Sequence, residues 1–309
     1  MFRILFYFLF IPGFIYTATL GLLATWIDRK ITARLQWRVG PRWFQPFADI
    51  AKLLGKEICV PEGAPKLVFI SAPIIGLSAA VLVSTMLWTL NVARYSGFVG
   101  DLIVIIYLLT IPSLSMMVGA SASRNPISAL GASREMKLML AYELPFLIAI
   151  ATVIAKVGSI IIGNIIGFQS MHGAIIGSLS GFMAFLVSVI VIQAKLGFVP
   201  FDMAESEQEL MGGICLEYSG ALLALFRITK AMLLFTLPML LITLFWGGLD
   251  ISSFGGVLWF IFKYVIILTL LILIKNTNPR LRIDQAVRFF WGPVTLLAIA
   301  GLLLALIGL

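Results

Sequence analysis

The chain has 309 residues, of which 61% are hydrophobic and 12% are charged, and its mean hydropathy is +1.08. Such a composition excludes a water-soluble domain. The 22 Lys and Arg outnumber the 14 Asp and Glu. In a chain this apolar, the excess is expected to report membrane topology, and no nucleic-acid partner is expected.

Eight apolar runs are each long enough to cross a bilayer as a helix, which takes about 18 residues or more. In chain order they cover residues 2–26, 67–90, 102–120, 138–155, 175–198, 216–246, 257–274 and 291–309. No small-residue cleavage pattern follows the first run, which we interpret as a retained helix. We therefore predict an all-α polytopic membrane protein of about eight transmembrane helices, with residues 1–309 forming a single integral membrane domain.

Basic residues are concentrated in alternate connections between these runs. The connections after the first, third, fifth and seventh runs hold 16 Lys and Arg, Lys195 at the end of the fifth run included, whereas the other three hold 2. Because basic connections stay in the cytoplasm, we predict a multi-pass protein of the cell membrane with both termini on the outer side.

The first connection, residues 28–66, predicts a helix that lies on the membrane surface. Gly40 and Pro41 break a basic segment, after which apolar residues recur at the spacing of an interfacial amphipathic helix. The apolar positions are Phe44, Phe47, Ile50, Ala51 and Leu54, and the polar ones are Gln45, Asp49, Lys52 and Lys56. The connection is either a lipid anchor or a docking surface for peripheral subunits. The docking candidates are Arg29, Lys30, Arg34, Arg38 and Arg42.

Three ionisable residues fall inside predicted membrane spans: Glu143, Arg227 and Lys230. Arg227 lies ten residues after Glu217, or about 15 Å along a helix, which predicts a position near the middle of the bilayer. An isolated charge at that depth costs several kcal/mol, so such residues are paired or hydrated. They either form structural ion pairs or relay charge across the membrane.

A cluster of acidic residues lies on the predicted cytoplasmic side. Five carboxylates occur within residues 202–217, and Glu135 precedes Glu143 by eight residues on broadly the same side of one helix. Neighbouring carboxylates raise one another's pKa, so a cluster can hold and release protons. The predicted ion-coupling path comprises Glu135, Glu143, Asp202, Glu205, Glu207, Glu209, Glu217, Arg227 and Lys230.

The sequence gives no indication of a cofactor bound by this chain. Cys59 and Cys215 lack the paired spacing of zinc or iron–sulfur ligands. No phosphate loop, dinucleotide fingerprint or nucleophile elbow is found. If the chain takes part in an enzyme, its redox cofactors are expected on partner subunits.

Four segments resemble a membrane subunit of the respiratory complex I family that adjoins the quinone chamber. They are "DRKITARLQWRVGPRWFQPFADIAKLLGKE" (28–57), "GASREMKLMLAYE" (131–143), "PFDMAESEQELMGGICLEYSG" (200–220) and "NPRLRIDQAVRFFWG" (278–292). The resemblance implies a subunit at the joint between an electron-carrying peripheral arm and an ion-moving membrane arm. It also implies a hetero-oligomer with antiporter-like membrane subunits, and it places the acids of residues 202–209 beside the chamber. Glu143 and Glu217 would begin the path into the membrane.

Two departures from the complex I pattern favour a hydrogenase branch of this family. Glu135 follows Arg134 where complex I typically has a neutral residue, and the stretch between Pro41 and Gln45 is short. "GASRE" is more similar to membrane-bound [NiFe] hydrogenases, hydrogenlyases and the related sulfane reductases. That branch implies peripheral hydrogenase-like large and small subunits carrying iron–sulfur clusters, and a nickel–iron centre in the hydrogenases. The alternative is a quinone-chamber subunit of a complex I-type NADH- or ferredoxin-quinone oxidoreductase. The sequence leaves open whether H⁺ or Na⁺ is moved.

Overall fold

The computed structural model describes residues 2–93, 97–251 and 253–308. Within these ranges the protein is all-helical and has no strand, as predicted. The α-helices are α1 (Phe2–Leu9), α2 (Phe14–Leu35), α3 (Gln45–Leu54), α4 (Lys66–Val92), α5 (Asp101–Leu108), α6 (Ile111–Ala122), α7 (Pro126–Val157), α8 (Ile162–His172), α9 (Leu179–Lys195), α10 (Glu207–Leu210), α11 (Gly220–Phe245), α12 (Phe254–Thr277), α13 (Ile283–Phe289) and α14 (Thr295–Ile307). Short 3₁₀ or π turns are η2 (Ile175–Gly177), η3 (Gly213–Cys215) and η4 (Phe290–Val294).

Seven segments of the described chain are long and apolar enough to cross a membrane. They are Phe6–Leu35, Lys66–Val92, Asp101–Ala122, Pro126–Val157, Gly220–Phe245, Phe254–Thr277 and Ile283–Ile307. The fifth predicted run corresponds to α9, a shorter apolar helix of 17 residues, or about 26 Å. The polytopic all-α prediction is confirmed, with seven long spans and one shorter helix where eight spans were expected.

Proline and glycine explain where the helices begin and break. Pro12 and Gly13 separate α1 from α2, and a Cβ at Gly13 would clash with the Phe8 carbonyl. The side chain of Asn125 caps α7 by accepting a hydrogen bond from the Ile127 amide, and Pro126 occupies the first turn. Because α7 therefore begins well before residue 138, it carries both Glu135 and Glu143.

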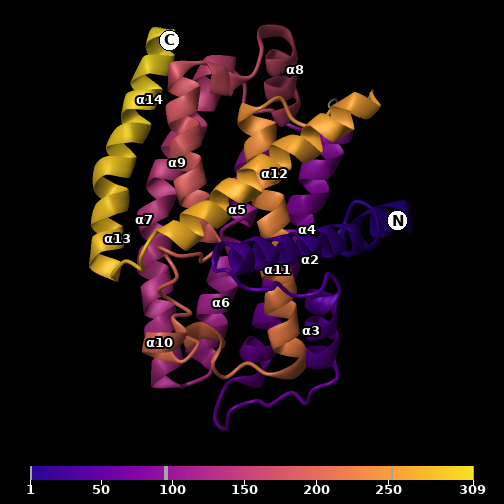
Figure 1. Ribbon diagram of the computed structural model, residues 1–309, viewed down its shortest axis with the longest axis vertical. Coiled ribbons are helices and arrows are strands. Elements are labelled where there is room, and N and C mark those ends of the chain that lie inside the picture. Colours follow the sequence, from indigo (N-terminus) through magenta and orange to yellow (C-terminus); the bar gives the residue numbers. More distant parts are fainter. Residues whose placement is uncertain (1, 94–96, 252, 309) are drawn as a thin grey trace.

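Helix α11 forms the centre of the bundle. Its most apolar window is 94% buried, compared with 22–50% for the other six spans. Figure 1 shows α4, α6, α7, α9 and α14 running roughly along the bundle with α11, while α2 crosses it at a steep angle. The crossing brings the end of α2 against α11 and α3, and a charged cavity lies there.

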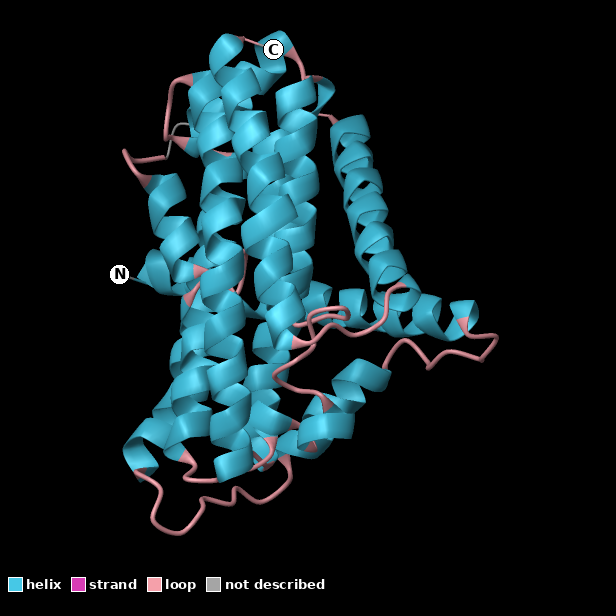
Figure 2. Cartoon of the chain, turned by 90° about the vertical axis from the view of Figure 1, so that its left-hand side faces the viewer, coloured by secondary structure: helices cyan, strands magenta, loops and turns pink. Residues whose placement is uncertain are grey.

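The two ends of the bundle differ in character. One end carries α3, α10 and the longest loops, whereas the other carries α8 and the C-terminus (Figures 1 and 2). The acid-rich segment of residues 202–217 belongs to the first end. The amphipathic helix predicted in the first connection is present as α3, but its polar face is not turned outward as a whole. Pro46, Asp49 and Ile50 line a cavity, while Ala51 and Leu54 are exposed.

Candidate functional site

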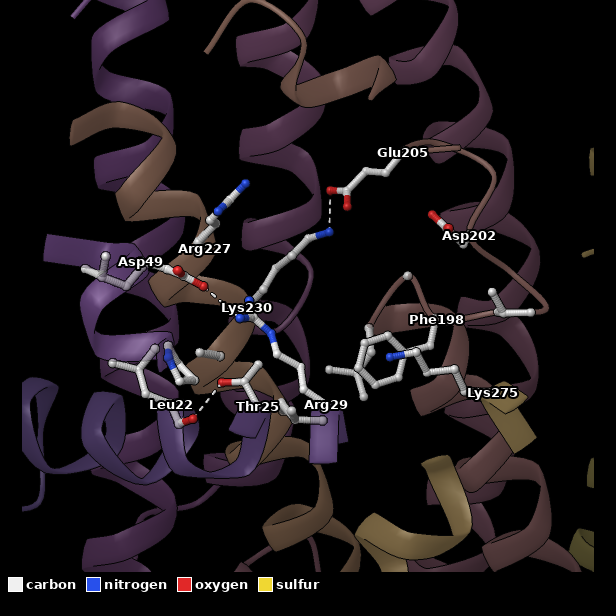
Figure 3. Close-up of a pocket in the computed structure, with 17 residues that line it drawn as sticks. Leu22, Thr25, Arg29, Asp49, Phe198, Asp202, Glu205, Arg227, Lys230 and Lys275 are labelled. Carbon is white, nitrogen blue, oxygen red and sulfur yellow. Dashed lines mark hydrogen bonds and ion pairs between the residues drawn. The ribbon is translucent and has the colours of Figure 1, made fainter. Parts of the chain in front are cut away.

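A charged cavity of about 330 Å³ lies between α2, α3, α11 and the segment that follows α9. Figure 3 shows charged side chains reaching into it from all of these elements. Seven of its 17 lining residues carry formal charge: Arg29, Asp49, Asp202, Glu205, Arg227, Lys230 and Lys275. Cations and carboxylates therefore face one another across a space large enough to hold several water molecules.

The acidic segment reaches the cavity because it folds back on itself. The Ile214 amide donates a hydrogen bond to the Ala204 carbonyl at 3.4 Å. Gly213 has φ +45°, and a Cβ there would clash with the same carbonyl. Gly131 of α7 also lies close to this carbonyl. Glycines on two elements thus allow the loop to pack against α7 and to aim Glu205 inward.

Glu205 forms an ion pair with Lys230 of α11. The Cys215 thiol also donates a hydrogen bond to Glu205, with Sγ 3.7 Å from the carboxylate oxygen. Burial, followed by the charge of Glu205, raises the pKa of the Cys215 thiol to about 12. The thiol therefore stays protonated near neutral pH and acts as a donor.

Glu135 of α7 lies near the ion pair between Glu205 and Lys230. It is 9% exposed, and it lines a second, smaller cavity of about 30 Å³ together with Glu205, Lys230 and Lys195. A polar space of this size can hold a water molecule. Glu135 thus shares this cavity with two lysines, Lys230 of α11 and Lys195 of α9.

Glu143 pairs with a residue that the sequence analysis did not single out. The Lys195 ammonium lies 2.9 Å from its carboxylate, and the Lys195 side chain is only 4% exposed. The same ammonium lies over the rings of Tyr142 and Phe146, at 5.2 and 4.9 Å from their centroids. A lysine at the end of an apolar run was the available signal, because an intramembrane charge is functional by default.

Two other acids of the segment form ion pairs with arginines. Asp202 binds Arg280 at 3.0 Å and Glu209 binds Arg134 at 2.6 Å. Both pairs line a cleft of about 240 Å³ between the acidic segment and the connection to α13. Glu207 begins α10, and its side chain lies outside the part of the chain that the structure describes.

Two residues of the predicted path lie elsewhere than expected. Glu217 lines neither of the two inner cavities and accepts a hydrogen bond from Asn125 at 2.5 Å. Arg227 is exposed and lines the larger cavity. Because α11 begins at Gly220, Arg227 lies about 10 Å into the helix, where about 15 Å was expected.

The predicted docking residues divide into two groups. Arg29 turns into the cavity and binds Asp49 at 2.7 Å. Burial raises the Asp49 pKa, but hydrogen bonds from Arg29 and Gln45 outweigh it, so the pKa is lowered and the carboxylate stays charged. Lys30 is half-buried, whereas Arg34, Arg38 and Arg42 are exposed beside Trp37 and Trp43, which are 98% and 61% exposed.

A further ion pair joins α2 to α12 at the cavity wall. Lys275 binds the buried Asp28 at 2.7 Å and lies 4.5 Å from the centroid of the Phe198 ring. Neither residue was among the candidates predicted from the sequence. Among the described residues, no group of three or more His, Cys, Asp or Glu side chains could hold a metal ion.

Comparison with known proteins gives consistent matches over nearly the whole chain. A family model described as NADH dehydrogenase matches residues 8–306. A subunit of the NADH-quinone oxidoreductase of Brevibacillus brevis is 32% identical over 292 residues, which covers 91% of this chain and 86% of the relative. The corresponding subunit of Bacillus cytotoxicus is also 32% identical, over 297 residues, covering 93% and 87%.

A solved structure matches the fold equally well. A chain from the structure of the membrane-bound sulfane sulfur reductase, an archaeal respiratory membrane complex, superposes with a TM-score of 0.86 at 30% sequence identity. The match covers 94% of this chain and 96% of that one. The similarity therefore extends to helix arrangement as well as sequence.

Proposed function

Since the chain belongs to the NADH dehydrogenase family and is a multi-pass membrane subunit of a hydrogenase-like or complex I-like respiratory complex, we propose that it couples electron transfer in its partners to ion translocation. The ion is H⁺ or Na⁺. On this proposal the chain also docks the peripheral redox arm at its acid-rich end. It performs no redox chemistry itself, and its partners hold the redox cofactors.

One observation carries the coupling proposal: charged groups of both signs lead from the cavity into the bundle. Asp202 and Glu205 face the cavity, Lys230 binds Glu205, Glu135 shares the inner cavity with Lys230 and Lys195, and Lys195 binds Glu143. We call these six residues the charge row. Its two buried members, Glu135 and Lys195, each lie beside a group of opposite charge.

The charge row can respond to events in the cavity. A change in charge or hydration beside Glu205 weakens its ion pair with Lys230. The freed ammonium then acts on Glu135, which lies on the other side of it. Because charges interact strongly where water is scarce, the disturbance passes to Lys195 and Glu143 without a large movement of the backbone. Coupling of this kind needs titratable groups rather than a bound redox centre.

The hydrogenase-type reading rests on the two departures from the complex I pattern, Glu135 after Arg134 and the short stretch between Pro41 and Gln45. The 30% identity to the sulfane sulfur reductase chain agrees with that reading. The alternative, a quinone-chamber subunit, is favoured by the 32% identity to the NADH-quinone oxidoreductase subunits.

The exposed basic loop supports the docking part of the proposal. Arg34, Arg38 and Arg42 are exposed, and the neighbouring Trp37 and Trp43 present large aromatic surfaces. Arginine and tryptophan are enriched at protein interfaces. We propose that the peripheral hydrogenase-like large and small subunits dock there, and that antiporter-like membrane subunits continue the membrane arm.

Replacement of Lys230 by Met tests the coupling proposal. The change keeps most of the side-chain volume and removes the charge that joins Glu205 to Glu135. In sealed vesicles carrying the assembled complex, ion uptake per electron is expected to fall at least tenfold, while electron transfer to an artificial acceptor in the peripheral arm persists. Lys52→Met, on the exposed side of α3, is the control and should retain full uptake. Unchanged uptake in Lys230→Met would contradict the proposal.

A further inference from the structure

A groove unrelated to the charge row lies at the opposite end of the bundle. It encloses about 720 Å³ where α7, α8 and α14 end, beside η2. This end carries α8 and the C-terminus in Figure 1. The lining residues are Ala155, Lys156, Phe168, His172, Gly173, Ala174, Ile175, Ile176, Gly177, Ser178, Ala305 and Gly308. The volume falls within the range of about 300–1,000 Å³ that is typical of ligand sites.

The polar groups of the groove are complementary to an anion. Lys156 lies in the last turn of α7, and within the described chain it forms no ion pair. No carboxylate lines the groove. The His172 ring stacks on Phe168, with Nδ1 3.3 Å from the Phe168 carbonyl oxygen. A cation and a nitrogen heterocycle therefore face a space that contains no acidic side chain.

Lys156 is also an exception to the distribution of basic residues between the connections of the chain. The three connections predicted to face the outer side hold 2 Lys and Arg in total, and Lys156 is one of them. A basic residue on that side is not needed to orient the protein, because the 16 basic residues of the other connections already do so. Lys156 lies in the last turn of α7, however, and a lysine at the end of a membrane helix extends its ammonium toward the lipid headgroups.

Apolar side chains continue the groove toward the surrounding lipid. Met171 of α8 is 84% exposed, and Leu306 and Ile307 of α14 are 68% and 74% exposed. In a membrane protein such surface is covered by hydrocarbon chains. A hollow that holds Lys156 and His172 and has an apolar margin matches a molecule that has an anionic head and hydrocarbon tails.

We propose that this groove binds one anionic phospholipid, with its phosphate at Lys156 and His172 and its chains along the ends of α8 and α14. The site is independent of the proposed coupling function. It would hold the ends of three helices together on the side of the membrane opposite the charge row.

Native mass spectrometry of the assembled complex tests the proposal. The complex is purified in detergent and incubated with phosphatidylglycerol in excess phosphatidylcholine. The double variant Lys156→Gln/His172→Gln is expected to retain at least fivefold less phosphatidylglycerol than the wild type. Lys52→Gln, at the other end of the molecule, should retain as much as the wild type. Equal retention in the double variant and the wild type would overturn the proposal.

Two further measurements use the native groove and do not depend on how well the double variant assembles. Inorganic phosphate in excess should fail to displace phosphatidylglycerol, because it lacks the chains. Displacement would show that the groove binds free phosphate, which contradicts the proposal. A photoreactive benzoylphenylalanine at position 171 should cross-link phosphatidylglycerol. Cross-linking to another subunit would mean that protein covers the groove and would equally overturn it.

Discussion

Glu205 accepts hydrogen bonds from two side chains, the ammonium of Lys230 and the thiol of Cys215. The ammonium supplies charge, whereas the thiol is a weak donor. Together they hold the carboxylate between the cavity and the interior of the bundle. Lys230, which forms the ion pair with Glu205, thus also lies beside Glu135.

The Cys215 thiol should resist alkylation near neutral pH. Its pKa is raised to about 12, so only about one thiol in 10⁴ is ionised at pH 8, and the thiolate is the nucleophile. In a Cys59→Ala variant of the assembled complex, maleimide labelling is expected to be negligible from pH 7 to 9. Labelling should become complete after denaturation in SDS. Rapid labelling of the native complex at pH 8 would show that the thiol is not held protonated.

At the residue scale, the sequence predicted which side chains are charged but not which ones meet. Glu135, Glu205 and Lys230 were expected to act together, and the cavities bring them together. Glu143 was expected near Lys230, but it pairs with Lys195. Such pairings depend on the rotation of α9 against α7, and spacing along one helix carries no information about a neighbouring helix.

At the scale of elements, the acidic segment is positioned by backbone geometry. Gly213 has a positive φ and lies so close to the Ala204 carbonyl that no side chain fits. The turn therefore cannot close around any larger residue. Helix α3 was predictable from the periodicity of its apolar residues. Which of its faces turns toward the cavity was not predictable in this way. The salt bridge between Arg29 and Asp49 turns part of its polar face toward the cavity.

Replacement of Gly213 by Ala should disrupt the acidic segment. The added Cβ would meet the Ala204 carbonyl, and the left-handed backbone conformation itself costs about 1 kcal/mol for a residue with a side chain. The amount of assembled complex on a native gel, or its ion uptake per electron, is expected to fall at least fivefold. Gly167→Ala in α8, where no atom lies within 4 Å of the added carbon, should behave like the wild type. Normal assembly and uptake in Gly213→Ala would show that the turn is more adaptable than its packing suggests.

At the scale of the whole molecule, the two ends have different chemistry. The end with α3 and α10 carries the cavity, the acidic segment and the basic loop, whereas the other end carries the groove at Lys156. The distribution of basic residues predicts that the first end faces the cytoplasm. Hydropathy was sufficient to predict the helical class. It could not predict the steep crossing of α2, because that depends on contacts between helices. Helix α9 is short because Ser178 caps its start and Gly197, with φ +62°, follows its end.

Cysteine labelling in intact cells should report this orientation. The test uses a background in which Cys59 and Cys215 are replaced by Ala. His172→Cys is expected to react with a membrane-impermeant maleimide added from outside. Lys52→Cys, on the exposed side of α3, should react only after the membrane is opened. Reaction of both from the outside, or of Lys52→Cys alone, would refute the assigned topology.

The central claim is that the charge row relays charge rather than merely packing the bundle, and ion uptake per electron in a Glu135→Gln variant tests it most directly. Glutamine keeps the shape and much of the hydrogen bonding of Glu135 but removes its titrating proton and its charge. Sealed vesicles carrying the assembled complex should show unchanged electron transfer to an artificial acceptor and at least a tenfold loss of ion uptake per electron. Glu217→Gln, which alters a carboxylate outside both inner cavities, should retain uptake. Full uptake in Glu135→Gln, or an equal loss in Glu217→Gln, would contradict the account.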